Sequence, residues 1–195
     1  NSIVNAFNNV IANANGNIST NGDVTAQTGK AVLNSSAGSV TMQNVTADQA
    51  VDIDAAQDIT ADGNLTSNNG DITLDAGGSI TTNGNINAYD HLFANAKGDI
   101  GINGDITTEN GSAVLKSNSG SITTNGNVNV YDNVIANAAG DITTNGDITT
   151  ENGSVVLNSS AGSVTMQNIT ANNKVDIDAA QDITADGNLT SNNGD

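Results

Sequence analysis

A repeat of about 20 to 21 residues runs through the whole chain and constrains its fold more than any other feature. The repeated unit is Gly, then Asp, Ser or Asn, then an aliphatic residue, then Thr, as in G-D-I-T, G-S-V-T and G-N-L-T. A fixed period of this length is typical of solenoids, in which each turn stacks on the previous one. The aliphatic residue of the unit recurs in steps of 19 to 22 residues, at Ile18, Val40, Ile59, Ile80, Ile100, Ile122, Ile142, Val164 and Ile183.

Two further apolar series keep the same period and predict two more strands in every turn. The gaps between strands contain Asn-Gly, Asp-Gly and Gly-Gly pairs, which are typical of turns, and they are too short for helical crossovers. We therefore predict a parallel β-solenoid with three short strands per turn and about nine turns. The second series is Val24, Val45, Leu65, Ile86, Ile106, Val128, Ile148, Ile169 and Leu189, and the third is Ala31, Val51, Ile72, Leu92, Ala113, Val134, Val155 and Val175.

The predicted core is a narrow prism, because aromatic residues make up only 2 % of the chain and cannot fill a round core. Side chains of a strand alternate between its two faces, so Val51 and Ile53 point inward and Asp52 points outward. Small residues are expected in one corner of the prism, at Ser35, Ala55, Ala76, Ala96, Ser117, Ala138, Ser159 and Ala179.

Longer repeats are superimposed on the short one. Residues 31–71 recur at 155–195 with five substitutions, an offset of 124, and residues 81–112 recur at 123–154, an offset of 42. We expect residues 1–195 to form one continuous solenoid segment that is cut within a repeat at both ends.

The residue before the first apolar series alternates in charge from turn to turn. Stacked turns lie roughly 4.8 Å apart, and two carboxylates at that separation repel by about 1 kcal/mol in water. Alternation removes this repulsion and explains the 42-residue period, so it indicates turns stacked in register. The column reads Asn17, Ser39, Asp58, Ser79, Asp99, Ser121, Asp141, Ser163 and Asp182.

The charge balance limits the partners of the chain. Its 21 acidic residues and four lysines give a net charge of -17, which argues against nucleic acid and against anionic membranes as partners. No apolar run approaches the length of a membrane span, so direct membrane insertion is not expected. The expected partners are adjacent repeats of the same long chain.

The G-D-I-T, G-S-V-T and G-N-L-T units, with Asn-Gly turns and a period near twenty, resemble the haemagglutinin repeats of filamentous-haemagglutinin-type adhesins exported by two-partner secretion. The resemblance covers the whole chain and implies a right-handed β-helix, the hand that parallel crossovers also prefer. It further implies a structural stalk of a large secreted bacterial surface adhesin, located outside the cell and projecting a distal binding or toxin module.

Two other function classes stay open. One is a self-associating extracellular matrix or filament protein of the biofilm type, with lateral association between copies. The other is ice binding by threonine ladders, which the [DSN]-x-T pattern of the outward positions disfavours.

Catalytic chemistry finds little support in the sequence. His91 is the only histidine and there is no cysteine, which excludes catalytic triads and thiolate metal sites. We interpret His91 as a strand residue facing solvent. Carboxylate pairs could still act in hydrolysis, but there is no arginine or loop insertion to build a site around them. We predict no catalytic residue, no cofactor and no enzymatic activity.

Asp52, Asp54 and Asp75 are the one candidate metal site, because oxygen ligands suit calcium. Asp176 and Asp178 are their repeat equivalents. The alternative interpretation is a hydrated acidic patch, since the calcium-binding sequence G-G-x-G-x-D does not occur.

An apolar strip is expected on the outside of four adjacent turns, formed by Phe93, Val114, Ile135 and Val156. Contiguous exposed apolar surface often marks an interaction site. The strip is therefore predicted to bind a partner, or else to be covered by a neighbouring part of the chain. The candidate partner-binding residues are these four together with Tyr89 and Tyr131.

Overall fold

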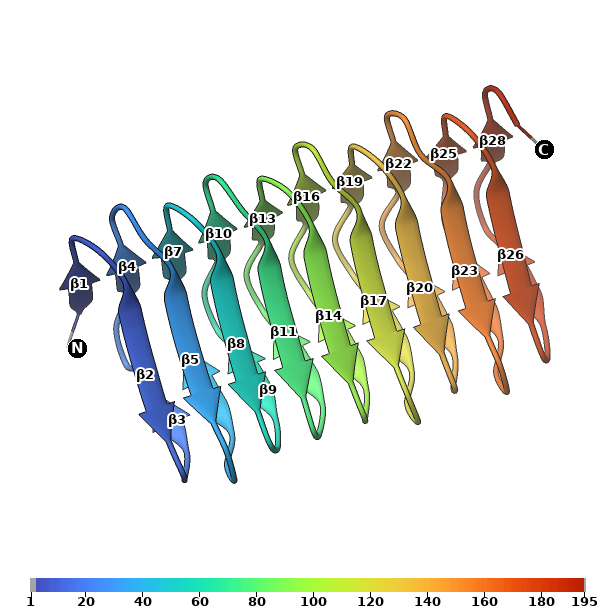
Figure 1. Cartoon of the computed structure of the whole chain (residues 1–195). Helices are drawn as coiled ribbons and strands as arrows, with labels where there is room; N and C mark the ends of the chain where they lie inside the picture. Colours follow the sequence, from blue (N-terminus) through green and yellow to red (C-terminus); the bar gives the residue numbers. More distant parts are fainter. Residues whose placement is uncertain (1–2, 195) are drawn as a thin grey trace.

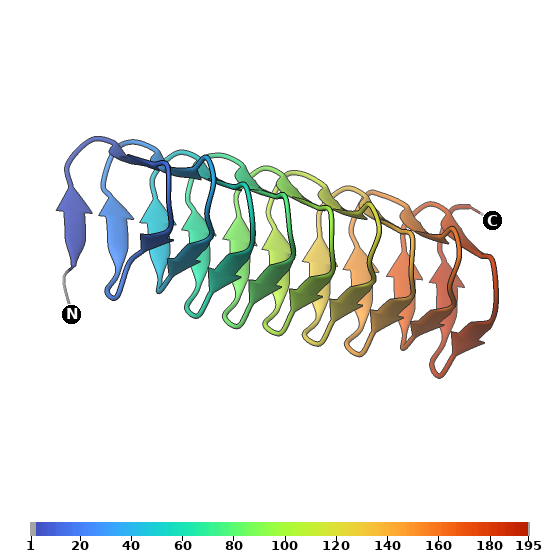
Figure 2. The same ribbon diagram turned by 90° about the horizontal axis from the view of Figure 1, so that it is seen from below.

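The computed structural model describes residues 3–194, which form one coil of short parallel strands without any helix. In Figure 1 the termini lie at opposite ends of the coil, and Figure 2 shows the same turns stacked along one axis from below. The long strands run downward at the front of Figure 1 while the chain returns behind them and advances from left to right, the right-handed sense expected of parallel crossovers. The predicted β-solenoid of about nine turns, with three strands and about 21 residues per turn, is confirmed.

Each turn contributes one strand to each of three sheets, in the order B, C, A. Sheet A contains β1 (Val4–Ala6), β4 (Val24–Ala26), β7 (Val45–Ala47), β10 (Leu65–Ser67), β13 (Ile86–Ala88), β16 (Ile106–Thr108), β19 (Val128–Val130), β22 (Ile148–Thr150), β25 (Ile169–Ala171) and β28 (Leu189–Ser191). Sheet B contains β2 (Val10–Ala14), β5 (Ala31–Ser35), β8 (Val51–Ala55), β11 (Ile72–Ala76), β14 (Leu92–Ala96), β17 (Ala113–Ser117), β20 (Val134–Ala138), β23 (Val155–Ser159) and β26 (Val175–Ala179). Sheet C contains β3 (Ile18–Ser19), β6 (Val40–Met42), β9 (Ile59–Ala61), β12 (Ile80–Thr82), β15 (Ile100–Ile102), β18 (Ile122–Thr124), β21 (Ile142–Thr144), β24 (Val164–Met166) and β27 (Ile183–Ala185).

Residues alternate between buried and accessible along the strands, as the pleat requires. In β8, Val51, Ile53 and Ala55 are buried while Asp52 and Asp54 are exposed. The inward side chains of the three sheets form one continuous cluster from Val10 to Ala171. The core is thus as long as the coil and only as wide as the side chains of three facing strands.

Small residues occupy the corner between sheets B and C, as predicted. Ser35 is buried there, its hydroxyl donates to the carbonyl of Gly16 at 2.8 Å, and it accepts from the N–H of Gly38 at 3.0 Å. Ser117 and Ser159 make the corresponding pairs of hydrogen bonds in their own turns. A buried hydroxyl with both functions satisfied carries no desolvation penalty, and these serines hold the bend closed.

The sequence suggests that the glycines of the repeat are needed for the backbone conformation of turns, but the structure gives them a different role. Such turns commonly need a positive φ, but no residue of the described range has one. A Cβ placed on Gly120 would lie 2.4 Å from Oδ1 of Asp99, and one on Gly162 would lie 2.3 Å from Oδ1 of Asp141. These glycines are required because the previous turn approaches too closely for a side chain.

Candidate functional surfaces

A line of side-chain oxygens, the sheet C ladder, links each turn to the next just ahead of sheet C. Each member except the last accepts a hydrogen bond from the backbone N–H of its counterpart one turn later. Oδ1 of Asp99 accepts from the N–H of Ser121 at 2.8 Å, and Oγ of Ser121 accepts from the N–H of Asp141 at 3.0 Å. The full ladder consists of Asn17, Ser39, Asp58, Ser79, Asp99, Ser121, Asp141, Ser163 and Asp182.

A second line, the sheet A ladder, precedes sheet A. Oδ1 of Asn85 accepts from the N–H of Asp105 at 2.9 Å, and Oδ1 of Asp105 accepts from the N–H of Asn127 at 2.8 Å. The separation of aspartates by uncharged residues that we expect for the sheet C column is present there, and the sheet A ladder has it too. Repulsion explains why aspartates are not neighbours, but the N–H contacts explain why every member has a short side chain with an acceptor atom. The sequence interpretation missed this second requirement.

His91 belongs to a similar line ahead of sheet B and is half-buried there. Its N–H donates to Oδ1 of Asp71 at 2.9 Å, and its Nδ1 accepts from the N–H of Ser112 at 2.9 Å. The imidazole also lies beside the ring of Phe93, with 5.5 Å between ring centroids. The expected place within a strand is wrong, since His91 directly precedes β14. Its side chain is partly accessible to solvent, and its imidazole replaces the Asp, Asn or Ser acceptor that joins two turns.

The three aspartates of the candidate calcium site lie on adjacent strands of sheet B. Asp54 of β8 is paired with Asp75 of β11, so two carboxylates are direct neighbours here. Partial burial, followed by the charges of Asp75 and Asp52, raises the pKa of Asp54 above its usual 3.8. Across residues 3–194, no group of three or more acidic or histidine side chains is arranged to hold a metal ion. Calcium binding at Asp52, Asp54 and Asp75 stays a prediction.

The apolar strip lies on the outer face of sheet B. Phe93, Val114, Ile135 and Val156 are successive partners in the parallel register. Phe93 is 40 % exposed and the other three are partly exposed. Tyr89 and Tyr131 lie four residues before strip members, just after sheet A strands. The structure thus places the strip on the surface, and its partner-binding role stays a prediction.

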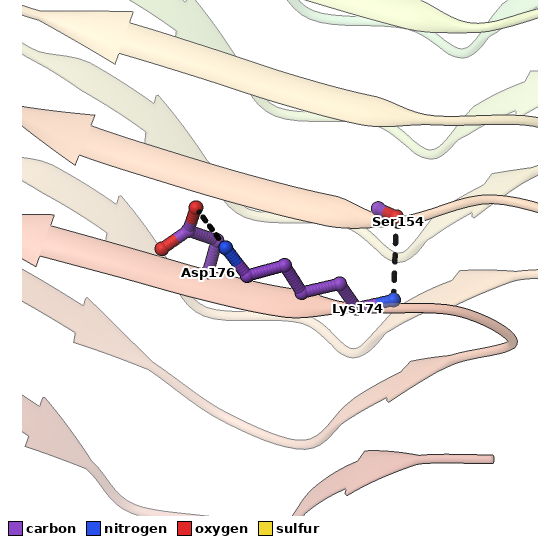
Figure 3. A network of polar contacts seen from close by, with 3 residues as sticks. All are labelled: Ser154, Lys174 and Asp176. Carbon is purple, nitrogen blue, oxygen red and sulfur yellow. Dashed lines mark hydrogen bonds and ion pairs between the residues drawn. The ribbon is translucent and has the colours of Figure 1, made fainter. Parts of the chain in front are cut away.

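The acidic end of sheet B carries one ion pair. Nζ of Lys174 lies 2.7 Å from Oδ2 of Asp176, and the N–H of Lys174 donates to Oγ of Ser154 at 3.2 Å (Figure 3). Both side chains of the pair are about half exposed, so water screens the attraction and it adds little stability. We assign this pair no functional role.

Comparisons with protein-family models, with curated proteins and with solved structures find no match to this chain.

Proposed function

We propose that this chain is a structural segment of the stalk of a large secreted bacterial surface adhesin, which holds a distal binding or toxin module away from the cell. The supporting observation is the set of hydrogen-bonded ladders, which repeat the same contacts from turn to turn over a continuous core. Each turn pairs only with the turns before and after it, so such a rod can lengthen by duplication without redesign. Nine turns correspond to roughly 45 Å of rod.

The proposed role is structural and not catalytic. The single imidazole uses Nδ1 to hold the next turn, and most aspartates recur as a lattice along the rod, several of them as ladder acceptors. Neither arrangement resembles a pocket in which neighbours tune one acid against another. The resemblance of the repeat to the haemagglutinin repeats of secreted adhesins supports a proposed location outside the cell.

The 124-residue repeat allows whole turns to be deleted without breaking the register of the stack. Deleting residues 31–154 from the full-length protein joins Lys30 to Val155, whose following sequence nearly copies residues 31–71. The deletion removes six turns, roughly 29 Å of rod, and leaves the columns in register. In the native bacterium we expect the shortened protein to reach the surface in normal amounts but to mediate less attachment, measured by surface labelling and by an adhesion assay.

Two results would contradict this proposal. One is unchanged attachment, which would show that the length of the rod has no role. The other is a protein that stays inside the cell in both forms. A deletion of residues 31–144, which breaks the register, serves as the control for misfolding.

The apolar strip supports a second candidate, lateral self-association in an extracellular matrix. Replacing Val114 and Ile135 by Thr keeps β-branching and costs little on an exposed strand. We expect sedimentation at high concentration to show weaker association for this variant than for the control V114I/I135V. Identical profiles for wild type and both variants would leave the strip without this role.

A further inference from the structure

The only two tyrosines and the only two glutamates of the chain share one column, at Tyr89, Glu109, Tyr131 and Glu151. Each residue directly follows a sheet A strand, and the four strands, β13, β16, β19 and β22, are consecutive neighbours. The backbone fixes this register, since the N–H of Glu109 donates to the carbonyl of Ala88 at 3.1 Å and the turn of β22 stacks on that of β19 in the same way. Tyrosine and glutamate therefore alternate along one corner of the rod.

Two identical acidic rows flank the second tyrosine. Alternate residues of a strand share a face, so each turn presents an outward row of three side chains on sheet A. The rows over β16 and β22 are two turns apart, roughly 9.6 Å, and the row over β19 lies between them. The flanking rows are Asp105, Thr107, Glu109 and Asp147, Thr149, Glu151, and the central row is Asn127, Asn129, Tyr131.

The structure has a groove at this place, with a volume of about 400 Å³. Glu109 and Glu151 line its two sides together with Thr107 and Thr149, and Asn129 lies in its floor. Both glutamates are exposed and Tyr131 is half-buried at the end of the central row. Its lining comes from the ends of β16, β19 and β22, and Tyr131 directly follows the part that β19 contributes.

The charge of the groove is not neutralised by the chain itself. Within the described residues the one ion pair joins Lys174 to Asp176. Lys116 points outward from β17 on sheet B, a different face. No group of three or more acidic or histidine side chains in residues 3–194 is arranged to hold a metal ion, and this includes the two acidic rows. The arrangement therefore suits a ligand with several separated positive charges.

We propose that this groove binds an extended polypeptide segment rich in lysine or arginine. An extended segment lying along β19 sends successive side chains to opposite sides, so consecutive cationic residues reach the two acidic rows. The amides of Asn127 and Asn129 face its backbone. The ring of Tyr131 offers a surface for an aliphatic stem and a favourable site for a cation above it. The net charge of -17 attracts such a segment from a distance.

The first tyrosine provides an internal contrast. Tyr89 ends the row Asn85, Asn87, Tyr89, which has the acidic row of β16 on one side only. On its other side lies the uncharged row Asn64, Thr66, Asn68. In residues 3–194 the groove over β19 is the one place where a tyrosine lies between two glutamates, so binding should concentrate there.

The test is a nuclear magnetic resonance titration with acetyl-tetralysine amide, with acetyl-tetraglutamine amide as the uncharged reference. We expect saturable shifts of the side-chain amide signals of Asn127 and Asn129 with the first peptide alone. The variant E109Q/E151Q should bind roughly tenfold more weakly, because each exposed ion pair accounts for only a few-fold in affinity. The control D178N/D186N makes the same change in net charge at exposed positions elsewhere and should bind within about twofold of wild type.

A second pair of variants tests the aromatic contact. Tyr131→Ala should weaken binding about threefold, while Tyr89→Ala should leave it unchanged. Equal losses in E109Q/E151Q and D178N/D186N would overturn the proposal, because attraction would then be general. Shifts confined to other faces would do the same, as would shifts of Asn129 with a neutral oligosaccharide such as cellotetraose but not with tetralysine. The wild-type shift map decides the matter even if a variant fails to fold.

Discussion

Residues 31–71 and residues 155–195 differ at only five positions, yet they are buried to very different extents. Ile59 and Leu65 of the first copy are fully buried, whereas the corresponding Ile183 and Leu189 are 52 % and 45 % exposed. The difference comes from the neighbours, since β9 pairs with β6 and β12 while β27 pairs with β24 alone among the described strands. Sequence decides which side of a strand faces inward, and the next turn decides whether that side is buried.

The comparison also separates strand formation from burial. β26, β27 and β28 have the same bounds relative to the repeat as β8, β9 and β10. They keep the parallel register with one neighbour only. A preceding turn is thus sufficient to shape a strand, while full burial requires turns on both sides, as nearest-neighbour energetics predicts.

The largest expected effect is a contrast between Ile59→Ala and Ile183→Ala. Truncating a fully buried isoleucine costs about 3 kcal/mol through lost burial and the cavity left behind. In the isolated segment of residues 1–195 the half-exposed copy should cost about 1 kcal/mol or less, because much of its side chain is in water there. Urea unfolding followed by circular dichroism measures both, and equal losses would show that the two turns are equally buried in solution.

Gly63→Ala and Gly187→Ala sharpen the same contrast. A Cβ at Gly63 would lie 2.5 Å from Oδ1 of Asn44, and one at Gly187 would lie 2.6 Å from Oδ1 of Asn168. The clash is similar, but the turn of Gly63 is confined between two others. In the isolated segment of residues 1–195 we expect G63A to cost about 2 kcal/mol, in the range of overpacked cores, and G187A about half of that.

Gly101→Ala is the matched control for these glycine variants. It lies in β15, and a Cβ there would meet nothing within 4 Å. It should leave stability unchanged or raise it by about 0.5 kcal/mol, since glycine in a strand is entropically unfavourable. A loss in G101A as large as in G63A would refute the close-approach explanation.

Ser39→Asp and Ser163→Asp test repulsion along the sheet C ladder. Ser163 lies between Asp141 and Asp182, so its replacement creates three carboxylates in a row, whereas Ser39 lies between Asn17 and Asp58. We expect a loss of about 1 kcal/mol or less for S163D, about half as much for S39D, and a decrease of both with added salt. A difference that is insensitive to salt would rule out repulsion between charges as its cause.

The smallest expected effect concerns Asp54 and its copy Asp178. The pKa of Asp54 is raised in the folded state, so this group lowers stability as the pH rises from about 3.8 through that raised value. Asp54→Asn should remove this decrease and raise stability near neutral pH by about 0.5 kcal/mol or less. Asn158 pairs with Asp178 as Asn34 pairs with Asp54, but among the described residues none pairs with Asp178 on the side where Asp75 pairs with Asp54. In the segment of residues 1–195, D178N should therefore have a smaller effect. Thermal melts between pH 3 and 7 provide the measurement.

The fold was predictable from the sequence because its signal repeats. A single Ile such as Ile100 says little, but nine aliphatic residues at one period define a column, and alternation along a strand then assigns the inward face. The same logic placed Phe93 and Val114 outside, beside inward Leu92 and Ala113. In a solenoid the period identifies the long-range contacts, because residues one period apart are neighbours in adjacent turns.

The hydrogen bonds within the columns were harder to predict from the sequence. The sequence does not show that the Asp99 side chain accepts from the next N–H, because that depends on the position of a turn 22 residues away. The amide ladder of Asn83, Asn103 and Asn125 was missed for the same reason. The groove beside Tyr131 depends on which rows become neighbours across 42 residues, and the sequence interpretation weighed aromatics and acids separately.

The ladders have a polarity. At every step described here, the acceptor oxygen belongs to the earlier turn and the donor to the later one, as with Asn64 and Asn85. At some steps the donor is a side-chain amide and not a backbone N–H, as where Nδ2 of Asn44 donates to Oδ1 of Asp23. The donor still belongs to the later turn. A completed turn therefore offers side-chain acceptors to the turn that follows, although its own backbone N–H groups still need carbonyls of that turn, as where the N–H of Ile100 donates to the carbonyl of Ser121 at 2.9 Å. Growth from the N-terminus adds each turn to side-chain acceptors that are already in place, whereas growth from the other end would have to fit flexible side chains of the arriving turn onto the amides of the folded one.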